Sequence, residues 1–267
     1  DRREAPPADA ADVLRCHPER YLARLKAAVP AQGQVALDPD TWLSPGSLDA
    51  ALRAVGAACA AVDAVLAGED ARAFVAMRPP GHHAERETPM GFCLLGTAAI
   101  AAKRGLDHHG LDRVAVLDFD VHHGNGTQAC VERDPTIFFA SSHQWPCYPG
   151  TGHPKERGAG NVCNAILPPG SDGAAFRAAW ETMLLPALRA FAPELVVISA
   201  GFDAHADDPL AQLNAREADF AWLTDRLLET ADRHSGGRVV SLLEGGYDLD
   251  ALANSVAAHL RCLMRAA

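Results

Sequence analysis

Five short apolar runs are the feature of this sequence that most restricts its fold. Each run is apolar at nearly every position and rich in β-branched or aromatic residues, so it can be buried on both faces. The runs span residues 73–77, 114–119, 136–141, 195–199 and 239–243. Such runs are typical of central strands in a parallel sheet that helices cover on both sides.

Stretches with helical periodicity lie between and around these runs. They span residues 48–66, 93–104, 174–191, 215–233 and 249–265. Alternating strands and helices predict repeated β-α-β units, and so an α/β fold with a central, mostly parallel sheet and helices on both faces. We expect a single domain over residues 1–267, because a chain of 267 residues is close to the upper size for one hydrophobic core.

Composition narrows the class of protein. A net charge of -10 argues against a nucleic-acid-binding surface. An acidic face would favour a cationic partner, but we expect the charge mainly to keep the protein soluble. The 7 cysteines form no C-x-x-C pair, which disfavours a disulfide framework and indicates a reducing, cytoplasmic location. The longest apolar stretch, residues 91–102, is shorter than the ~20 residues that span a bilayer, so we expect no membrane association.

Polar motifs follow four of the apolar runs. RPPGHHA follows the first run, DFDVHHGNG closes the second, AGFDAHADD follows the fourth and EGGYD follows the fifth. In an open α/β sheet, ligands bind beyond the carboxyl ends of the strands. We therefore expect these four motifs to meet at one edge of the sheet.

The strongest sign of a metal site lies in residues 118–123, where two acids and two histidines share six positions. Residues two apart at a strand end point to the same side, so Asp118, Asp120 and His122 can converge. Burying these charges is costly unless they are paired or bound to metal. Asp203, after another strand, is the natural third ligand. Two carboxylates, one imidazole and an open position are typical of a catalytic site; zinc, manganese and iron(II) all suit such ligands.

Two adjacent histidines and a tyrosine are candidates for acid-base and electrophilic roles. His82 and His83 follow a rigid Arg-Pro-Pro-Gly turn, and metal-assisted hydrolysis benefits from a nearby base and acid. Tyr247 follows two glycines, and a phenol beside a metal can donate a hydrogen bond to a developing oxyanion. A second pair, His108 and His109, is expected to lie at the surface or to cap a helix.

The motifs, taken together, resemble those of the histone deacetylase family. RPPGHHA, GFC, LDFDVHHGNGTQ, SAGFDAHADDPL and LEGGYD occur in the family's order across most of the chain. The residues of the HHGNG and AGFDAHADDP motifs are similar to those of the class II and bacterial amidohydrolase-like branch rather than to those of class I. The resemblance implies an arginase-like α/β fold and a zinc ion bound by Asp120, His122 and Asp203.

The resemblance also implies catalytic roles. It makes His82 and His83 the acid-base pair. Asp118 would support His82, and Asn125 would support His83. Tyr247 would polarise the acyl carbonyl while His83 takes a proton from the attacking water. The implied reaction removes an acetyl or related acyl group from the side-chain amine of lysine in a protein or peptide.

Further residues match the family's substrate-binding positions. Gly91, Phe92 and Tyr148 would line an apolar slot for the lysine stem, and Asp40 would grip substrate backbone amides. Leu210 stands where polyamine-selective relatives carry a glutamate, which favours acyl-lysine over acetylpolyamine. The family also holds a structural potassium ion near the zinc. The matching residues are Asp118, Asp120, His122, Ser141 and Ser142, largely through backbone oxygens.

Three alternatives stay open. An acetylpolyamine amidohydrolase would perform the same chemistry on a small acetylated amine, and a catalytically silent module would only bind acylated lysine. A manganese ureohydrolase would need further bridging carboxylates, for which Asp207 and Asp208 could be mistaken; we expect Asp208 to anchor a loop or helix instead.

The ends of the chain and its source give weaker expectations. The sequence starts at Asp1 rather than Met, and the family's N-terminal His-Pro and arginine-bearing loop is expected to be missing from it, or the rim of the tunnel to be open. The alanine- and arginine-rich composition is bacterial in style. The sequence leaves the oligomeric state open, with a homo-oligomer as one option.

Overall fold

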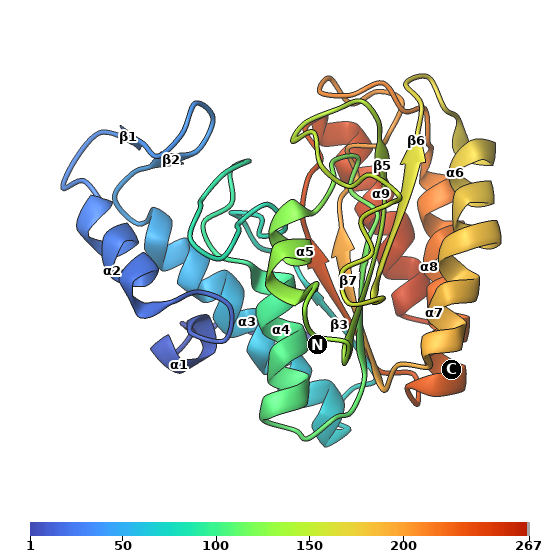
Figure 1. The fold of residues 1–267 in the computed structure, drawn as a ribbon, viewed down its shortest axis with the longest axis horizontal. Helices are drawn as coiled ribbons and strands as arrows, with labels where there is room; N and C mark the ends of the chain where they lie inside the picture. Colours follow the sequence, from blue (N-terminus) through green and yellow to red (C-terminus); the bar gives the residue numbers. More distant parts are fainter. Residues whose placement is uncertain (266–267) are drawn as a thin grey trace.

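The computed structural model describes residues 1–265 and contains a six-stranded sheet covered by helices on both faces (Figure 1). All neighbouring strands are parallel, in the order β3-β8-β7-β4-β5-β6. The strands are β3 (Arg72–Val75), β4 (Val114–Asp118), β5 (Ile137–Gln144), β6 (Val162–Leu167), β7 (Leu195–Ala200) and β8 (Val239–Leu243). The predicted α/β class with a mostly parallel sheet is confirmed.

Helices form a layer on each face of this sheet. One layer, drawn in blue and green in Figure 1, contains α1 (Ala10–Val13), α2 (Glu19–Ala28), α3 (Ser47–Ala67), α4 (Thr97–Asp107) and α5 (Asn125–Val131). The other contains α6 (Gly173–Ala179), the π-helical segment η1 (Trp180–Leu184), α7 (Leu185–Phe191), α8 (Glu217–His234) and α9 (Leu249–Leu263). A small antiparallel hairpin of β1 (Val35–Ala36) and β2 (Trp42–Leu43) projects beside the first layer.

The sheet separates two hydrophobic cores because successive side chains of a strand point to opposite faces. In β4, Val114 and Val116 pack in the core with α3 and α4, whereas Ala115 and Leu117 pack in the core with α8. All four side chains are fully buried. This is why the apolar runs show no alternation between apolar and polar residues.

The strand order places a topological switch point between β4 and β7. From β4 the chain moves outward to β5 and β6, whereas from β7 it moves the other way, to β8. Loops that leave neighbouring strands in opposite directions open a crevice at the carboxyl ends, where ligands bind in such folds. The motifs after β4 and β7 are the two that supply the predicted metal ligands.

The predicted secondary structure differs from the structure in several places. The helix expected from residue 93 begins at Thr97, because Cys93 closes a turn with Met90 through two backbone hydrogen bonds, with Gly91 and Phe92 at positive φ angles of 55° and 66° between them. The helix expected over 174–191 contains the wider turn of η1, followed by Pro186, which has no N–H to donate to a preceding carbonyl. Edge strand β6, the hairpin of β1 and β2, and helices α1, α2 and α5 were not expected.

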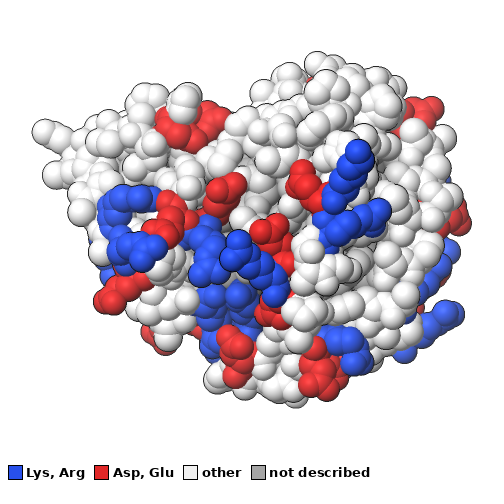
Figure 2. All heavy atoms as spheres, in the orientation of Figure 1, with Lys and Arg blue, Asp and Glu red and all other residues white. Residues whose placement is uncertain are grey.

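Helix α3 is long and apolar enough to cross a membrane by length and composition. In the structure, one face of this helix packs into the protein; Val55 and Val62, for example, are fully buried in the core shared with α4. On the face shown in Figure 2, acidic and basic side chains lie next to one another. The absence of membrane and nucleic-acid partners stays a prediction.

Candidate metal centre and catalytic site

Two loops at the switch point bring together the predicted metal ligands Asp120, His122 and Asp203. One ligand atom from each lies within 4.8 Å of the others. Nδ1 of His122 is 3.1 Å from Asp120 Oδ1 and 3.1 Å from Asp203 Oδ2. The exposed fractions of the three residues are 0%, 9% and 1%. The group therefore has the spacing, the burial and the mixed oxygen and nitrogen donors of a metal site.

Backbone amides hold both carboxylates in place. The N–H of Gly245 donates to Asp120 Oδ2 at 2.8 Å, and the N–H of Val121 donates to Asp203 Oδ1 at 2.9 Å. Residue 245 must be glycine, because a Cβ there would lie 2.3 Å from Asp203 Oδ2 and 2.6 Å from Asp120 Oδ2. The loop after β8 thus closes directly over the two carboxylates.

The electrostatics of this group fit a bound cation. Oδ2 of Asp203 is buried and, although Nδ1 of His122 lies 3.1 Å away, it accepts no well-oriented hydrogen bond from the described residues. Burial, followed by the neighbouring Asp120 carboxylate, raises the pKa of Asp203 to about 6. Two carboxylates in a water-poor site repel each other, and a divalent cation between them would offset both charges. The residues present therefore fit a metal ion.

The tandem histidines lie beside this group, on the loop after β3. Nδ1 of His82 is 3.1 Å from Asp118 Oδ2, and Nδ1 of His83 is 2.7 Å from Asn125 Oδ1. The two imidazole rings are 4.0 Å apart, and both residues are almost fully buried. The structure thus contains both hydrogen-bonded pairs that the sequence predicts, Asp118 with His82 and Asn125 with His83.

The surroundings drive the two imidazoles into different protonation states. Burial lowers the pKa of His82, but the carboxylates of Asp120, Asp118 and Glu244 outweigh it and raise the pKa to about 10. Burial and the adjacent charge of His82 lower the pKa of His83 well below its usual value. When the pKa values of two neighbouring groups are pushed apart in this way, one group can accept a proton while the other stays charged. His83 is the neutral imidazole of the pair.

Tyr247 lies on the loop after β8, facing the same site. Its backbone N–H donates to Asp208 Oδ2 at 2.7 Å, so Asp208 anchors this loop, as expected. The phenol ring lies 5.9 Å from the ring of Phe92, with the Arg78 guanidinium 5.8 Å from its centroid. Burial and the carboxylates of Asp120 and Asp203 raise the pKa of Tyr247, so it keeps its proton and can donate it in a hydrogen bond.

The predicted substrate-binding residues lie around this site. Phe92 and Tyr148 are each 38% exposed, and the Tyr148 ring packs edge-on against His83 at 5.2 Å. A Cβ on Gly91 would lie 2.3 Å from the His83 ring. Asp40 accepts a hydrogen bond from Thr41, whose own hydroxyl accepts one from the N–H of Phe92. The β1–β2 hairpin is thereby tied to the aromatic rim.

Leu210 and the predicted potassium ligands have distinct environments. Leu210 is 48% exposed, and its N–H donates to Asp208, next to the loop of Tyr247. Ser141 and Ser142 are buried beside β4, with their hydroxyls bonded to His143 and to the indole N–H of Trp180. Any cation there would rely on backbone oxygens, as the resemblance implies; potassium stays a prediction.

A buried glutamate that the sequence analysis did not select supports the histidine loop. Oε2 of Glu244 accepts the N–H groups of Gly81 and His82 at 2.7 and 3.1 Å, and Oε1 accepts the hydroxyl of Ser199 at 3.1 Å. Glu244 thus joins the ends of β7 and β8 to the tandem histidines. A charged residue at the end of an otherwise apolar strand is the sequence signal that could have identified it.

The expectation of a missing N-terminal His-Pro segment overlooked a pair within the chain. His17 and Pro18 lie between α1 and α2. The buried His17 ring lies 3.0 Å from the carbonyl oxygen of Arg86 and accepts the N–H of Gly96 at 2.9 Å. This N-terminal segment therefore packs against the chain that follows the tandem histidines.

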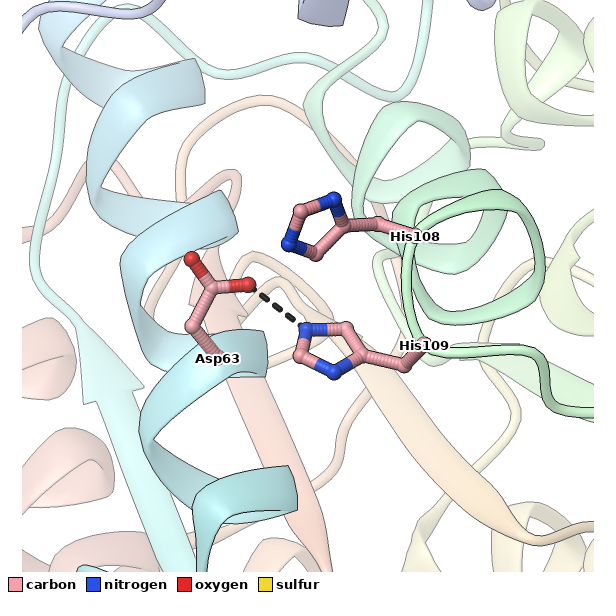
Figure 3. Close-up of side chains that lie close together, drawn as sticks. All are labelled: Asp63, His108 and His109. Carbon is pink, nitrogen blue, oxygen red and sulfur yellow. Dashed lines mark hydrogen bonds and ion pairs between the residues drawn. The ribbon is translucent and has the colours of Figure 1, made fainter.

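A second group of metal-binding residue types lies on the surface, away from the site. Asp63 of α3 faces His108 and His109 at the end of α4 (Figure 3). Both oxygens of Asp63 accept hydrogen bonds from the Arg104 guanidinium, at 2.7 and 2.8 Å, and His109 adds a third at 2.8 Å. A permanent cation already neutralises the carboxylate. The histidine pair is thus a surface and helix-capping feature, as expected.

The fold and the site are those of an α/β protein with a buried metal-binding group beside two histidines and a tyrosine at the carboxyl edge of its sheet. Comparison with known proteins identifies the family: the model of the histone deacetylase domain matches residues 1–263. The crystal structure of the HDA15 HD domain aligns with a TM-score of 0.91 at 31% identity, over 97% of this chain and 74% of that chain. The chain belongs to the histone deacetylase family, and it has the fold of that family's hydrolytic deacetylases.

The relatives of this chain include a bacterial and a plant protein. The histone deacetylase-like amidohydrolase of Pseudomonas aeruginosa is 44% identical over 251 residues, which cover 92% of this chain and 66% of that protein. Histone deacetylase 10, chloroplastic, of rice is 40% identical over 272 residues, covering 97% of this chain and 61% of that protein. The chain thus spans about two thirds or less of these relatives. Its cytoplasmic location and bacterial origin stay predictions.

Proposed function

We propose that this chain is a zinc-dependent hydrolase that removes an acetyl or related acyl group from the lysine side-chain amine of a protein or peptide. The observation that supports this most is the meeting of the metal-binding group, the neutral His83 and the phenol of Tyr247 at one end of the sheet. Asp120, His122 and Asp203 would hold the zinc. When bound, zinc supplies Lewis-acid polarisation of the acyl carbonyl and of water.

The side chains of this protein supply the remaining chemistry. His83 accepts a proton from the attacking water at Nε2, because its Nδ1 is engaged by Asn125. The phenol of Tyr247 donates a hydrogen bond to the carbonyl oxygen as negative charge develops there. His82 stays protonated and stabilises that charge, and His83 returns its proton to the leaving amine, so that the C–N bond breaks and lysine and a carboxylate are released.

Aromatic and apolar rim residues favour an acyl-lysine substrate. The exposed rings of Phe92 and Tyr148 suit the apolar stem of a lysine side chain. Leu210 offers no charge to the second ammonium group of an acetylated polyamine. Asp40, on the hairpin tied to Phe92, would accept hydrogen bonds from substrate backbone amides. A structural potassium ion beside β4 and β5 completes the proposed site.

Metal removal and restoration tests the proposal. A fluorogenic acetyl-lysine peptide should be hydrolysed by the zinc-loaded protein, lose turnover after chelation and regain it when zinc returns. Parallel assays with manganese and iron(II) rank the metals, and acetylputrescine distinguishes a small-amine hydrolase. Absence of hydrolysis for every acylated amine in zinc-loaded, folded protein would contradict an enzymatic role and favour a binding module.

A further inference from the structure

Asn125, the partner of His83, is itself held by a third residue, Glu85. Nδ2 of Asn125 donates to Glu85 Oε1 at 2.7 Å and to the sulfur of Met90 at 3.3 Å, while its Oδ1 lies 2.7 Å from His83 Nδ1. Glu85 follows His83 by two residues, on the same loop. The imidazole, the amide and the carboxylate therefore form a continuous chain of hydrogen bonds.

The chemistry of these three groups determines which atom donates and which accepts in each of their hydrogen bonds. A carboxylate only accepts hydrogen bonds, so the amide nitrogen of Asn125 must face Glu85. The amide oxygen must then face His83, and since this oxygen also only accepts, the proton of neutral His83 must reside on Nδ1. Nε2 of His83 is left with a free lone pair. Met90 offers a thioether, a much weaker acceptor than a carboxylate.

The other histidine needs no such selection. Its partner Asp118 is a carboxylate, whose Oδ2 accepts a hydrogen bond from Nδ1–H of His82 and cannot donate one. An asparagine is ambiguous, because rotating its amide by half a turn exchanges a donor for an acceptor. With the amide reversed, Asn125 would donate to Nδ1, the ring proton would move to Nε2, and His83 could no longer accept a proton from water.

We propose that Glu85 is a positioning residue that selects the amide orientation of Asn125 and thereby the Nδ1–H tautomer of His83. This inference rests on the proposed function, in which His83 is the base. Glu85 contacts neither substrate nor metal in this scheme. Its role is to make an asparagine act on His83 as an unambiguous hydrogen-bond acceptor, which a carboxylate would be without assistance.

Activity measurements on three single variants test the role of Glu85. Glu85→Leu should lower kcat about tenfold with little change in KM, the size of one lost charge-assisted hydrogen bond. Glu85→Gln retains an acceptor oxygen for Asn125 and should stay within about threefold of the parent. Glu87→Leu is the matched control, because Glu87 lies on the same loop but pairs with Arg20. It should leave kcat unchanged.

A double variant separates orientation from general support of the loop. Asn125→Asp replaces the ambiguous amide with a carboxylate and places it against Glu85, so this single variant should lose activity through repulsion. Adding Glu85→Leu removes that repulsion and should restore kcat to within about threefold of the parent, the scale of a minor hydrogen-bond change. An equal loss from Glu85→Leu in both backgrounds would mean that Glu85 only stabilises the loop, and would overturn the inference.

The tautomer can also be observed without turnover. Long-range ¹H–¹⁵N correlation spectra of histidine-labelled protein should show His83 protonated at Nδ1 in the parent and a mixture or the Nε2–H form in Glu85→Leu. The signals of His259, which bonds to Thr224 and Ser241, serve as an internal reference. An unchanged His83 tautomer in folded Glu85→Leu would overturn the inference. Lack of hydrolysis by the parent, with the tautomer change present, would instead contradict the proposed function.

Discussion

Two clusters of aspartate and histidine among residues 1–265 have the spacing of metal ligands, but they differ in burial and in how their charge is neutralised. Asp120, His122 and Asp203 are buried at the ends of two central strands, and one carboxylate oxygen there accepts no well-oriented hydrogen bond from the described residues. Asp63 lies between two helices at the surface with both oxygens bonded to Arg104. Residue type and proximity therefore do not define a metal site.

Neutralisation of charge is what separates the two groups. Burial disfavours ionisation of Asp63, but its hydrogen bonds to Arg104 and His109 outweigh this and lower its pKa. Burial instead raises the pKa of Asp203, where the adjacent Asp120 adds negative charge. A buried site with excess negative charge gains most from a cation, whereas a site that already contains a guanidinium gains little.

Removing a ligand from the buried group should have the largest effect. We expect His122→Ala to lose bound zinc and to reduce deacylation to the background of the assay. The matched surface variant His109→Ala should keep about one zinc per chain and parental activity, since its partner Asp63 is held by Arg104. Metal analysis after gel filtration, with activity on the same samples, measures both. Equal zinc loss from His122→Ala and His109→Ala would contradict the assignment of the metal to the buried group.

The phenol should contribute to rate but not to metal binding. Tyr247→Phe is expected to lower kcat about 10²- to 10³-fold, as for the loss of one oxyanion donor, while the zinc content stays that of the parent. The variant should fold as the parent does, because the backbone N–H of residue 247 still donates to Asp208. Circular dichroism checks this. Full activity in this variant would exclude the phenol from the proposed mechanism.

Burial also predicts how the fold responds to acid. The pKa of His259 is lowered to about 3 by burial, against an ordinary value of 6.5. Between these values the unfolded chain binds a proton that the folded chain does not, so stability falls as the pH drops below about 6.5 and is recovered as the pH rises. Integrated to pH 5, this one histidine should cost about 2 kcal/mol.

Urea unfolding at pH 7, 6 and 5 measures this loss. His259 donates from Nδ1 to Thr224, whose hydroxyl is already used as a donor to Phe220, and it accepts from Ser241. A His259→Gln variant, which cannot titrate, should show a shallower decline with pH even if it is less stable throughout. Parallel declines for parent and variant would mean that other groups account for the acid sensitivity.

The sheet and the metal-binding group were predictable for a common reason. Consecutive apolar positions identify strands that are buried on both faces, and polar residues directly after such strands can only gather at one sheet edge. Strand β6 was missed because Asn164 interrupts a short run at the sheet edge. Its side chain bonds Gln128, a partner from another element.

The supporting residues of the site were harder to predict, because their partners come from distant parts of the chain. Glu244 contacts Gly81 and His82, which precede it in the sequence by 163 and 162 positions. Glu85 is close to His83 in sequence, yet its role depends on Asn125, 40 positions further on. Local periodicity carries no information about such pairs; only the strand order brings them together.

The surface group should respond least to substitution, and this is the sharpest test of the comparison. Asp63→Asn removes the carboxylate that Arg104 and His109 share, but Arg104 keeps its 2.7 Å contact with Asp12. The Asp63 side chain is 38% exposed, so solvent screens the lost pair and the cost should be about 0.5 kcal/mol. Zinc content and kcat should not change. A change in zinc content or kcat in Asp63→Asn would mean that the surface group affects the active site. Burial and unneutralised charge would then not be enough to distinguish the two groups.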